Sequence, residues 1–268
     1  MGLFDVHAHL THPRLAADED AVLANAKAAG VTSILVNGLN PADNEAVAAL
    51  AARSDLVRPC FGLYPVDAVL PEMIAAGVDY PRDEGPVWEA EDAVAWVADH
   101  VDEAFAVGEI GLDGYWVPED LWDRQEEVFR KLLRIAKQAD KAVIIHTRKR
   151  ERRTLEVLQE EGIERVDWHC FGSKVKLARQ IAEHGHYLSI PANVRRVESF
   201  RRMVETLPKD RILLETDCPY LGPERGMRSE PAHVAGTAGF MAEVWGWTEA
   251  EVWEQLAGNY ERLFGVGP

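Results

Sequence analysis

Short apolar runs alternate with amphipathic stretches along the whole chain. The runs have the length of buried strands, whereas the stretches between them repeat their apolar positions every three to four residues, as helices do. We expect strands near residues 3–8, 31–37, 56–63, 105–110, 142–147, 165–170, 186–190 and 211–216. We expect helices near residues 15–29, 43–53, 121–139, 154–160, 175–184, 195–207, 231–245 and 248–264.

This alternation predicts an α/β protein with a parallel sheet, because most connections suit only crossover helices. Eight strand–helix units predict closure into a (β/α)₈ TIM barrel, and 268 residues fit one such barrel as a single domain over residues 1–268. The alternative is an open doubly wound sheet, which gathers its ligands at one switch point between neighbouring strands. Here polar candidates end strands along the whole chain, and only a closed ring brings those ends together.

One segment, near residues 71–92, is irregular and rich in glycine, proline and acidic residues. It is long for a connection between a strand and a helix. Since it follows the third strand, we expect it on the catalytic face of the barrel. Both a passive surface loop and a partial lid are compatible with its composition.

Composition limits the class of protein further. At 47% apolar residues the chain can build a full core, and no stretch has the roughly 18 apolar residues of a membrane span. No secretory signal is visible, and the three cysteines (Cys60, Cys170 and Cys218) are scattered, which suits a reducing cytosol. We therefore expect a cytoplasmic protein without membrane contact, and no obligate protein partner is evident.

The formal net charge of −16 argues against a nucleic-acid partner. The distribution weakens that argument, because residues 1–113 hold 20 acidic and only 5 basic side chains. Residues 141–153 contain six basic residues against one acidic residue. This run is typical of a solvated helix face. Arg148 could instead contact phosphate, because it lies two residues after His146.

Histidine and carboxylate residues close several apolar runs at equivalent points. His7 and His9 end the first run, and the other candidates, each at the end of a later run, are Glu109, His146, His169 and Asp217. Alternate residues of a strand share a face, so Asp5, His7 and His9 should all point into the barrel. Any one of these histidines could be a hydrogen-bonded core residue. Buried together without partners they would cost several kcal/mol each, whereas divalent cations would satisfy them all.

The number of candidates suggests two cations, since four imidazoles and two carboxylates exceed one tetrahedral site. The first ion would take His7, His9, Glu109 and Asp217. The second would take Glu109, His146 and His169, so that Glu109 bridges the ions. Asp5, two residues deeper, would orient an imidazole.

The ligand set also limits the metal and the chemistry. Nitrogen-rich ligation favours Zn²⁺, Mn²⁺, Co²⁺ or Fe²⁺ over Mg²⁺, although metal availability can override this preference. Water held between the ions would ionise near neutral pH, with Asp217 accepting its proton. Glu109 and Asp217 are thus the expected catalytic residues.

The motifs around these residues closely resemble the TatD family of metal-dependent hydrolases, the TatD-related deoxyribonucleases, within the amidohydrolase-type barrels. The resemblance runs the full length of the chain. Its motifs are Asp5–Leu10, Gly108–Asp113, Ile145–Arg148, His169–Phe171, Leu214–Leu221, Arg228–Pro231 and Asn259–Gly265. The resemblance implies a phosphoesterase that cleaves nucleic-acid phosphodiesters, DNA among them, with Glu109 as the bridging ligand. It also implies Arg148 and Arg228 as phosphate contacts.

Three positions depart from the family pattern. The third-strand motif Gly-x-His-Pro-His is replaced by Gly62–Val66, which contains Tyr64 and no histidine. Tyr64 can still donate a hydrogen bond to substrate, but it cannot carry positive charge near neutral pH. The other departures are the order Gly172–Ser173 and the serine at position 229.

Three functions follow from these patterns. The first is a dinuclear metal-dependent hydrolase that cleaves phosphodiesters, as a TatD-like deoxyribonuclease does. The second keeps the metal site but cleaves carboxylic esters or amides, as an aminoacyl-tRNA deacylase would. The third is a non-catalytic metal-binding scaffold, against which Glu109 and Asp217 argue because a structural site needs no open water position.

Overall fold

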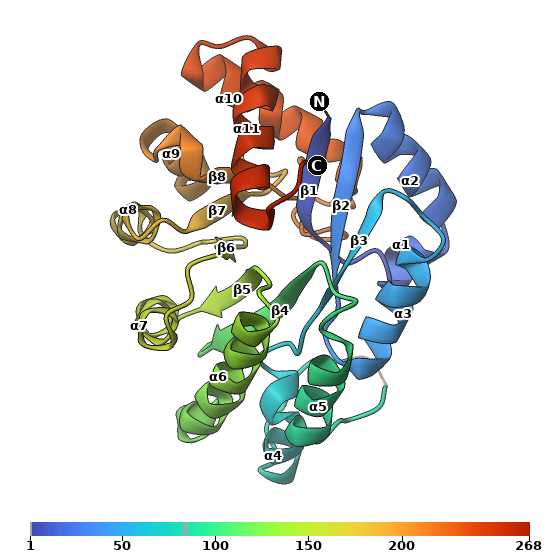
Figure 1. Cartoon of the computed structure of the whole chain (residues 1–268), viewed down its shortest axis with the longest axis vertical. Helices are drawn as coiled ribbons and strands as arrows, with labels where there is room; N and C mark the ends of the chain where they lie inside the picture. Colours follow the sequence, from blue (N-terminus) through green and yellow to red (C-terminus); the bar gives the residue numbers. More distant parts are fainter. Residues whose placement is uncertain (1, 83–84) are drawn as a thin grey trace.

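The computed structural model describes residues 2–82 and 85–268. Eight parallel strands form one sheet in sequence order (Figure 1). They are β1 (Leu3–Ala8), β2 (Val31–Asn37), β3 (Val57–Phe61), β4 (Ala106–Asp113), β5 (Val143–Arg148), β6 (Val166–Trp168), β7 (Tyr187–Ile190) and β8 (Ile212–Leu214).

The ring closes between the end of β1 and the segment that follows β8. Asp217 N donates a hydrogen bond to His7 O at 2.8 Å, and His9 N donates one to Cys218 O at 2.9 Å. Ala8 and Cys218 form a parallel bridge at the same place. The prediction of a (β/α)₈ barrel is therefore confirmed.

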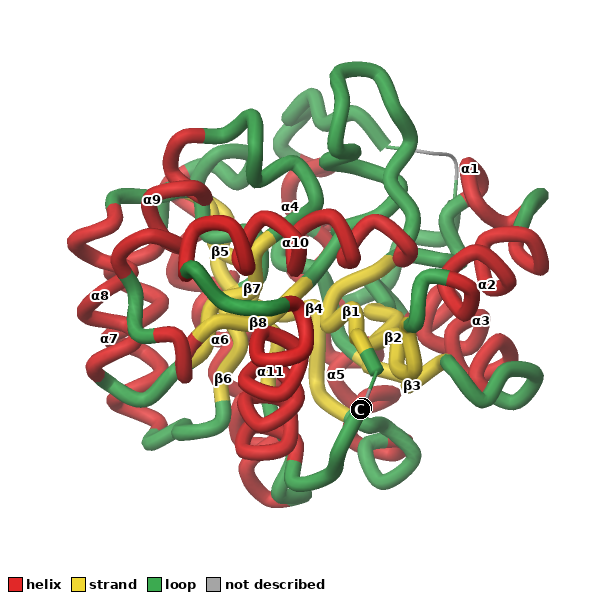
Figure 2. The backbone as a smooth tube through the Cα atoms, turned by 90° about the horizontal axis from the view of Figure 1, so that it is seen from above, coloured by secondary structure: helices red, strands yellow, loops and turns green. Residues whose placement is uncertain are grey.

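Helices surround the strands on all sides of the ring, as Figures 1 and 2 show. They are α1 (Pro13–Ala16), α2 (Glu19–Ala28), α3 (Pro41–Ala51), α4 (Leu70–Ala75), α5 (Ala90–His100), α6 (Trp122–Gln138), α7 (Glu151–Glu161), α8 (Val175–Glu183), α9 (Glu198–Thr206), α10 (Val234–Trp245) and α11 (Glu249–Phe264). No helix in the described residues is long and apolar enough to cross a lipid bilayer.

The helix ends follow ordinary capping chemistry. Asn40 caps α3 by accepting a hydrogen bond from Asp43 N, and Thr248 with Glu251 forms a capping box at the start of α11. Gly162 ends α7 in the left-handed conformation that glycine adopts without a Cβ clash. Every residue of β1 and β4 is buried, as expected for parallel strands covered on both faces.

Two helical predictions need correction. The single helix expected near residues 15–29 is two helices, α1 and α2, joined by Ala17 and Asp18. Helix α5 was not predicted, although Ala93, Val94 and Val97 form its buried side. Acidic residues around these positions made the segment resemble a loop.

The irregular segment is accordingly shorter than residues 71–92. Helix α4 occupies its first five residues and α5 its last three, so the part without helix or strand is 76–82 and 85–89. Residues 83 and 84 of the expected loop lie outside the described residues. Tyr80, within this loop, contacts Trp116 after β4 at a ring distance of 5.3 Å. The loop therefore lies on the side of the barrel where β4 ends.

Candidate metal centre

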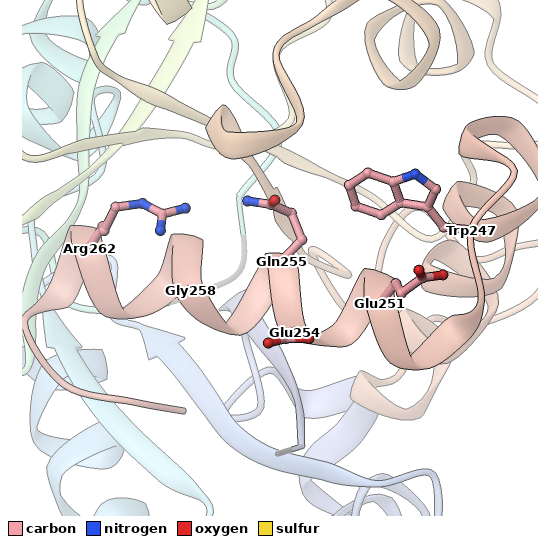
Figure 3. A pocket seen from close by; sticks show the side chains of 6 residues that line it. All are labelled: Trp247, Glu251, Glu254, Gln255, Gly258 and Arg262. Carbon is pink, nitrogen blue, oxygen red and sulfur yellow. The ribbon is translucent and has the colours of Figure 1, made fainter.

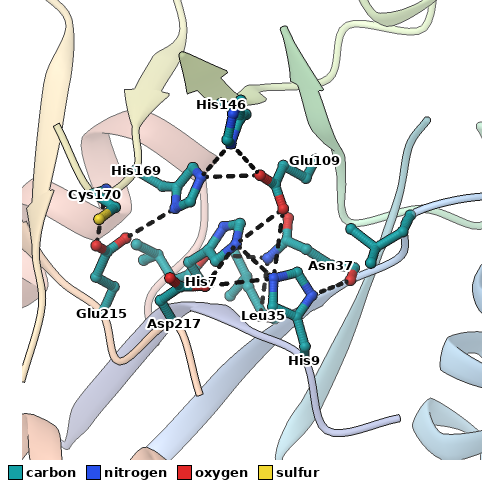
Figure 4. Close-up of polar contacts among 12 residues, drawn as sticks. His7, His9, Leu35, Asn37, Glu109, His146, His169, Cys170, Glu215 and Asp217 are labelled. Atoms are coloured by element: carbon teal, nitrogen blue, oxygen red, sulfur yellow. Dashed lines mark hydrogen bonds and ion pairs between the residues drawn. The ribbon is translucent and has the colours of Figure 1, made fainter. Parts of the chain in front are cut away.

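Glu109 lies at the centre of the polar cluster at the carboxyl ends of the strands (Figure 4). Its Oε2 atom is 3.4 Å from Nε2 of both His7 and His9. The two Nε2 atoms are 3.1 Å apart, and Asp217 Oδ1 lies 3.7 Å from His7 Nε2 and 3.5 Å from His9 Nε2. Four side chains from β1, β4 and the segment after β8 thus converge on one point.

The other oxygen of Glu109 faces a second set of nitrogen atoms. Glu109 Oε1 is 2.8 Å from His146 Nδ1 and 3.0 Å from His169 Nε2. These two nitrogen atoms are 3.4 Å apart. The His7 ring stacks on the His169 ring at 3.8 Å and so lies between the two sets. The six metal-ligand candidates expected from the sequence are therefore brought together.

The first set has the spacing that a tetrahedral ion requires. Ligand atoms about 2.1 Å from such an ion lie roughly 3.4 Å from one another. The two Nε2 atoms are 3.1 Å apart, and their distances to Glu109 Oε2 and Asp217 Oδ1 run from 3.4 to 3.7 Å. Hydrogen bonding alone explains the spacing poorly, because two Nε2 atoms and two carboxylate oxygens would share one or two protons. The donor set fits a divalent cation.

The second set offers three protein ligand atoms, the number typical of a catalytic ion with an open position. His7 belongs to two groups of residues whose ligand atoms lie within 4.8 Å of one another. One group is His7, His9 and Asp217, and the other is His7, Glu109 and His169. His7 is thus close enough to serve on either side of Glu109. The expected division of ligands places it on the first side only.

The neighbouring histidines keep the carboxylates of Glu109 and Asp217 ionised despite their burial. Glu109 and Asp217 are desolvated, which alone would raise the pKa of each. Their histidine partners outweigh that effect, so the pKa of Glu109 lies well below its usual value and the pKa of Asp217 is also lowered. Both side chains therefore remain anionic at neutral pH, as metal ligands must be.

The imidazoles differ in their affinity for protons. Burial lowers the pKa of His7 to about 4. For His9, burial acts in the same direction, but its hydrogen bond to Asp217 and the Glu109 charge raise its pKa to about 9. His146 is likewise raised to about 9, because Asp113 and Glu109 outweigh burial.

Two of the four imidazoles have a hydrogen-bond partner on the nitrogen that faces away from the cluster. Asp113 Oδ2 is 3.0 Å from His146 Nε2, and the backbone oxygen of Asn37 is 3.0 Å from His9 Nδ1. Such partners fix the ring orientation and tautomer of a metal-binding histidine. The outer nitrogens of the other two, His7 Nδ1 and His169 Nδ1, are buried without a hydrogen-bond partner among the described residues. Glu215 Oε2 lies 3.8 Å from His169 Nδ1, which is beyond hydrogen-bond distance.

Sequence reasoning missed the role of Asp113. Residues 109, 111 and 113 alternate along β4 and share a face, which is the signal that could have indicated it. Gly111 is paired with His146 across the sheet, and a Cβ at Gly111 would overlap the His146 carbonyl oxygen. Glycine therefore allows β4 and β5 to approach closely where Asp113 meets His146.

Asp5 acts differently from the expectation. Its carboxylate accepts hydrogen bonds from the backbone nitrogens of His7 and Thr216, at 3.1 and 2.9 Å, and from the Thr216 hydroxyl. No hydrogen bond joins it to an imidazole among the described residues. Asp5 instead holds together the two backbone segments that carry His7 and Asp217.

The three expected substrate contacts have different environments. The Tyr64 ring lies 4.9 Å from the His146 ring, edge to face, and burial raises the pKa of its phenol above the ordinary value. Arg148 is exposed at the end of β5. Arg228 is 2.6 Å from Asp18 and also donates to the Arg14 carbonyl, so a phosphate would have to compete for it.

A separate hollow lies on the outer surface of α11 (Figure 3). It has a volume of about 350 Å³ and is lined by Trp247, Glu251, Glu254, Gln255, Gly258 and Arg262. None of these residues belongs to the cluster around Glu109, and none is histidine or cysteine. The candidate centre is therefore the cluster at the strand ends.

Comparison with known proteins decides the family. A model of the TatD related DNase family matches residues 4–265. The chain belongs to this family. Deoxyribonuclease TATDN3 of Homo sapiens is 32% identical to it over 268 residues, which cover 98% of this chain and 95% of that protein. The uncharacterized metal-dependent hydrolase YabD of Bacillus subtilis is 32% identical over 275 residues, covering 98% and 99%.

The fold agrees with a solved member of the TatD group. The TatD homologue YJJV of Escherichia coli K12 superposes with a TM-score of 0.83 at 24% identity, covering 98% of each chain. The resemblance inferred from the motifs is confirmed. This TatD protein is a metal-dependent hydrolase with candidate metal-binding groups at the carboxyl ends of its barrel strands.

Proposed function

We propose that this TatD protein is a dinuclear metal-dependent phosphodiesterase that acts on nucleic acid, with DNA as the leading substrate. The observation that best supports this proposal is the position of Glu109. One carboxylate oxygen faces His7 and His9, and the other faces His146 and His169. A carboxylate with a separate ligand set on each oxygen is what a bridging ligand requires.

The ligand assignment is part of the proposal. One divalent ion would be held by His7, His9, Glu109 and Asp217, and the other by Glu109, His146 and His169. When bound, the ions would acidify water at neutral pH and offset the charge that develops on a transferring phosphoryl group. Zn²⁺, Mn²⁺, Co²⁺ or Fe²⁺ fits this nitrogen-rich set better than Mg²⁺.

The side chains around the ions would divide the remaining work. Asp217 would accept the proton of the attacking water, since its lowered pKa keeps it ionised and its side chain is 15% exposed toward solvent. Tyr64, neutral because burial raises its pKa, would donate a hydrogen bond to the substrate. Arg148 and Arg228 would bind phosphate oxygens.

The name of the human relative, a deoxyribonuclease, supports the choice of a phosphodiester. One observation favours the second candidate, a carboxylic ester or amide hydrolase such as an aminoacyl-tRNA deacylase. Tyr64 supplies no positive charge, and it packs against an apolar cluster that contains Val66 and Val117. A neutral donor beside an apolar wall suits an uncharged carbonyl group at least as well as a phosphate.

The test compares two chromogenic substrates on metal-reconstituted protein. We expect metal-dependent release of p-nitrophenol from bis(p-nitrophenyl) phosphate at a rate well above that from p-nitrophenyl acetate. The reverse preference would favour the ester or amide hydrolase. Hydrolysis of neither substrate by protein with bound metal would favour a non-catalytic scaffold.

A further inference from the structure

An exposed aromatic ring stands beside the candidate centre, in the loop that follows β4. Tyr115 is 45% exposed, although it is only two residues beyond Asp113. The guanidinium carbon of Arg148 lies 3.5 Å from the centre of the Tyr115 ring, and Lys149 Nζ lies 4.6 Å from it. Two cations and one aromatic ring thus form a single stack at the ends of β4 and β5.

Hydrogen bonds fix this stack to the metal centre. The backbone nitrogens of Tyr115 and Trp116 both donate to Asp113 Oδ1, at 2.7 and 2.8 Å. The other oxygen of Asp113 is bonded to His146. Gly114 N also donates to the carbonyl oxygen of Arg148 at 2.8 Å. The same carboxylate therefore orients a ligand candidate and positions the aromatic ring.

The two cations of the stack are not neutralised by carboxylates. Across residues 2–82 and 85–268, no ion pair involves the side chain of Arg148 or Lys149. Two arginines farther along the same basic run differ, since Arg150 and Arg153 both pair with Glu126. The charges of Arg150 and Arg153 are thus paired within the protein, whereas those of Arg148 and Lys149 at the strand end are available to a ligand.

We propose that Tyr115, Arg148 and Lys149 form a subsite for an unpaired nucleotide next to the scissile phosphodiester. The base stacks on the face of the Tyr115 ring opposite Arg148. The edge of the Arg148 guanidinium stays available to a phosphate oxygen, as proposed above, and Lys149 contacts a neighbouring phosphate. Base–aromatic stacking is tolerant of sequence, because every base has a π-face. This inference rests on the proposed phosphodiesterase function and adds the residues that hold a base beside the cleaved bond.

The acidic character of the chain makes such a subsite useful. With a net charge of −16, long-range attraction of a polyanion is absent, so binding must depend on local contacts. Stacking is a local contact that depends little on net charge. The subsite would thus retain a nucleic acid that the overall field repels.

The test uses metal-reconstituted full-length protein, a single-stranded oligothymidylate and an oligonucleotide of the same length with an abasic residue beside the cleaved bond. For the wild type we expect KM for the base-bearing strand to be lower by roughly ten-fold. Tyr115→Leu should remove that difference, whereas Tyr115→Phe should keep it. A matched control is Trp247→Leu, which removes a ring that also has a cation over it, with Lys209 Nζ 4.2 Å from the ring centre. Trp247 lines the hollow beside α11 (Figure 3) and is not part of the cluster around Glu109, so this variant should keep the difference.

Equal discrimination by Tyr115→Leu and Tyr115→Phe would overturn the subsite while leaving the phosphodiesterase function intact. A binding measurement separates the two failures. A phosphorothioate-linked oligonucleotide carrying 2-aminopurine should lose fluorescence on the wild type and Tyr115→Phe through stacking, but much less on Tyr115→Leu. If the wild type cleaves no phosphodiester, the proposed function fails, and absence of this fluorescence difference would then also refute the subsite.

Discussion

Replacing Glu109 by glutamine changes one atom and tests the shared-carboxylate geometry. The carboxylate has four nitrogen atoms within 3.4 Å, two for each oxygen. Glutamine keeps one neutral oxygen and places an amide group, a hydrogen-bond donor, where the second set of ligands needs an acceptor. Both candidate ions therefore lose the same negative charge.

The magnitude follows from burial. Glu109 is 3% exposed, and removing one partner from a buried charge interaction costs about 3–5 kcal/mol. At about 1.4 kcal/mol per ten-fold change, a cost of about 3–5 kcal/mol means that metal affinity should fall by roughly 10²- to 4 × 10³-fold. Turnover of bis(p-nitrophenyl) phosphate should nearly disappear at metal concentrations that saturate the wild type.

Glu215→Gln is the matched control, because it makes the same chemical change at an equally buried position. Burial raises the pKa of Glu215 well above its usual value, so its neutral form is the favoured one and glutamine imitates it. Its contacts with Cys170 N and the Ser189 hydroxyl can both be kept by an amide. We expect metal affinity within a few-fold of the wild type.

Metal content after dialysis against a chelator of known affinity, measured by elemental analysis, is the assay. The reasoning is refuted if Glu109→Gln retains the metal content and activity of the wild type. It is equally refuted if Glu215→Gln loses as much metal as Glu109→Gln, since the charge on Glu109 would then not be the cause.

Three further changes probe the surroundings of the centre. Asp113→Asn places an amide donor opposite His146 Nε2 and so favours the histidine tautomer with its proton on Nδ1, the nitrogen that faces the metal. Chelator competition should then show metal affinity lowered roughly 10- to 100-fold. An unchanged affinity would contradict the orienting role of Asp113. Tyr64→Phe keeps the ring but removes the hydrogen-bond donor. We expect kcat/KM for a phosphodiester to fall roughly ten-fold with little change in melting temperature. A lower melting temperature with unchanged kcat/KM would assign Tyr64 to packing alone. Burial raises the pKa of Asp67 to about 6. Between pH 4 and 6 the folded protein therefore keeps a proton on Asp67 that the unfolded chain has already released. The free energy of unfolding falls with rising pH over this range. Urea unfolding in a metal-free buffer should find Asp67→Asn more stable than the wild type by up to about 3 kcal/mol at pH 8 and equal to it near pH 4, whereas a constant difference would refute the shift.

The sequence predicted the eight strands and the barrel because each strand is a short, mostly apolar and mostly buried run. Strand ends were less predictable, since they depend on pairing with neighbours. Strand β4 extends to Asp113 rather than ending near residue 110, because it stays paired with β5 as far as Arg148. Helix α5 was missed because its buried side is small and its exposed side is acidic.

The cluster around Glu109 was predictable for a related reason. A closed barrel brings the ends of all strands to one rim, so residues at equivalent strand positions must meet. Contacts between side chains of different loops were not predictable. Arg228 is engaged by Asp18, and Arg148 stacks on Tyr115, and both pairings depend on loop paths that periodicity does not specify.

The central claim is that the two oxygens of Glu109 serve two different ions. Anomalous scattering from crystals of protein loaded with Mn²⁺ or Zn²⁺ tests it most directly. We predict two peaks, one beside His7 and His9 and one beside His146 and His169, each within bonding distance of a different Glu109 oxygen. A single peak, or two peaks of which neither lies against Glu109, would contradict the account.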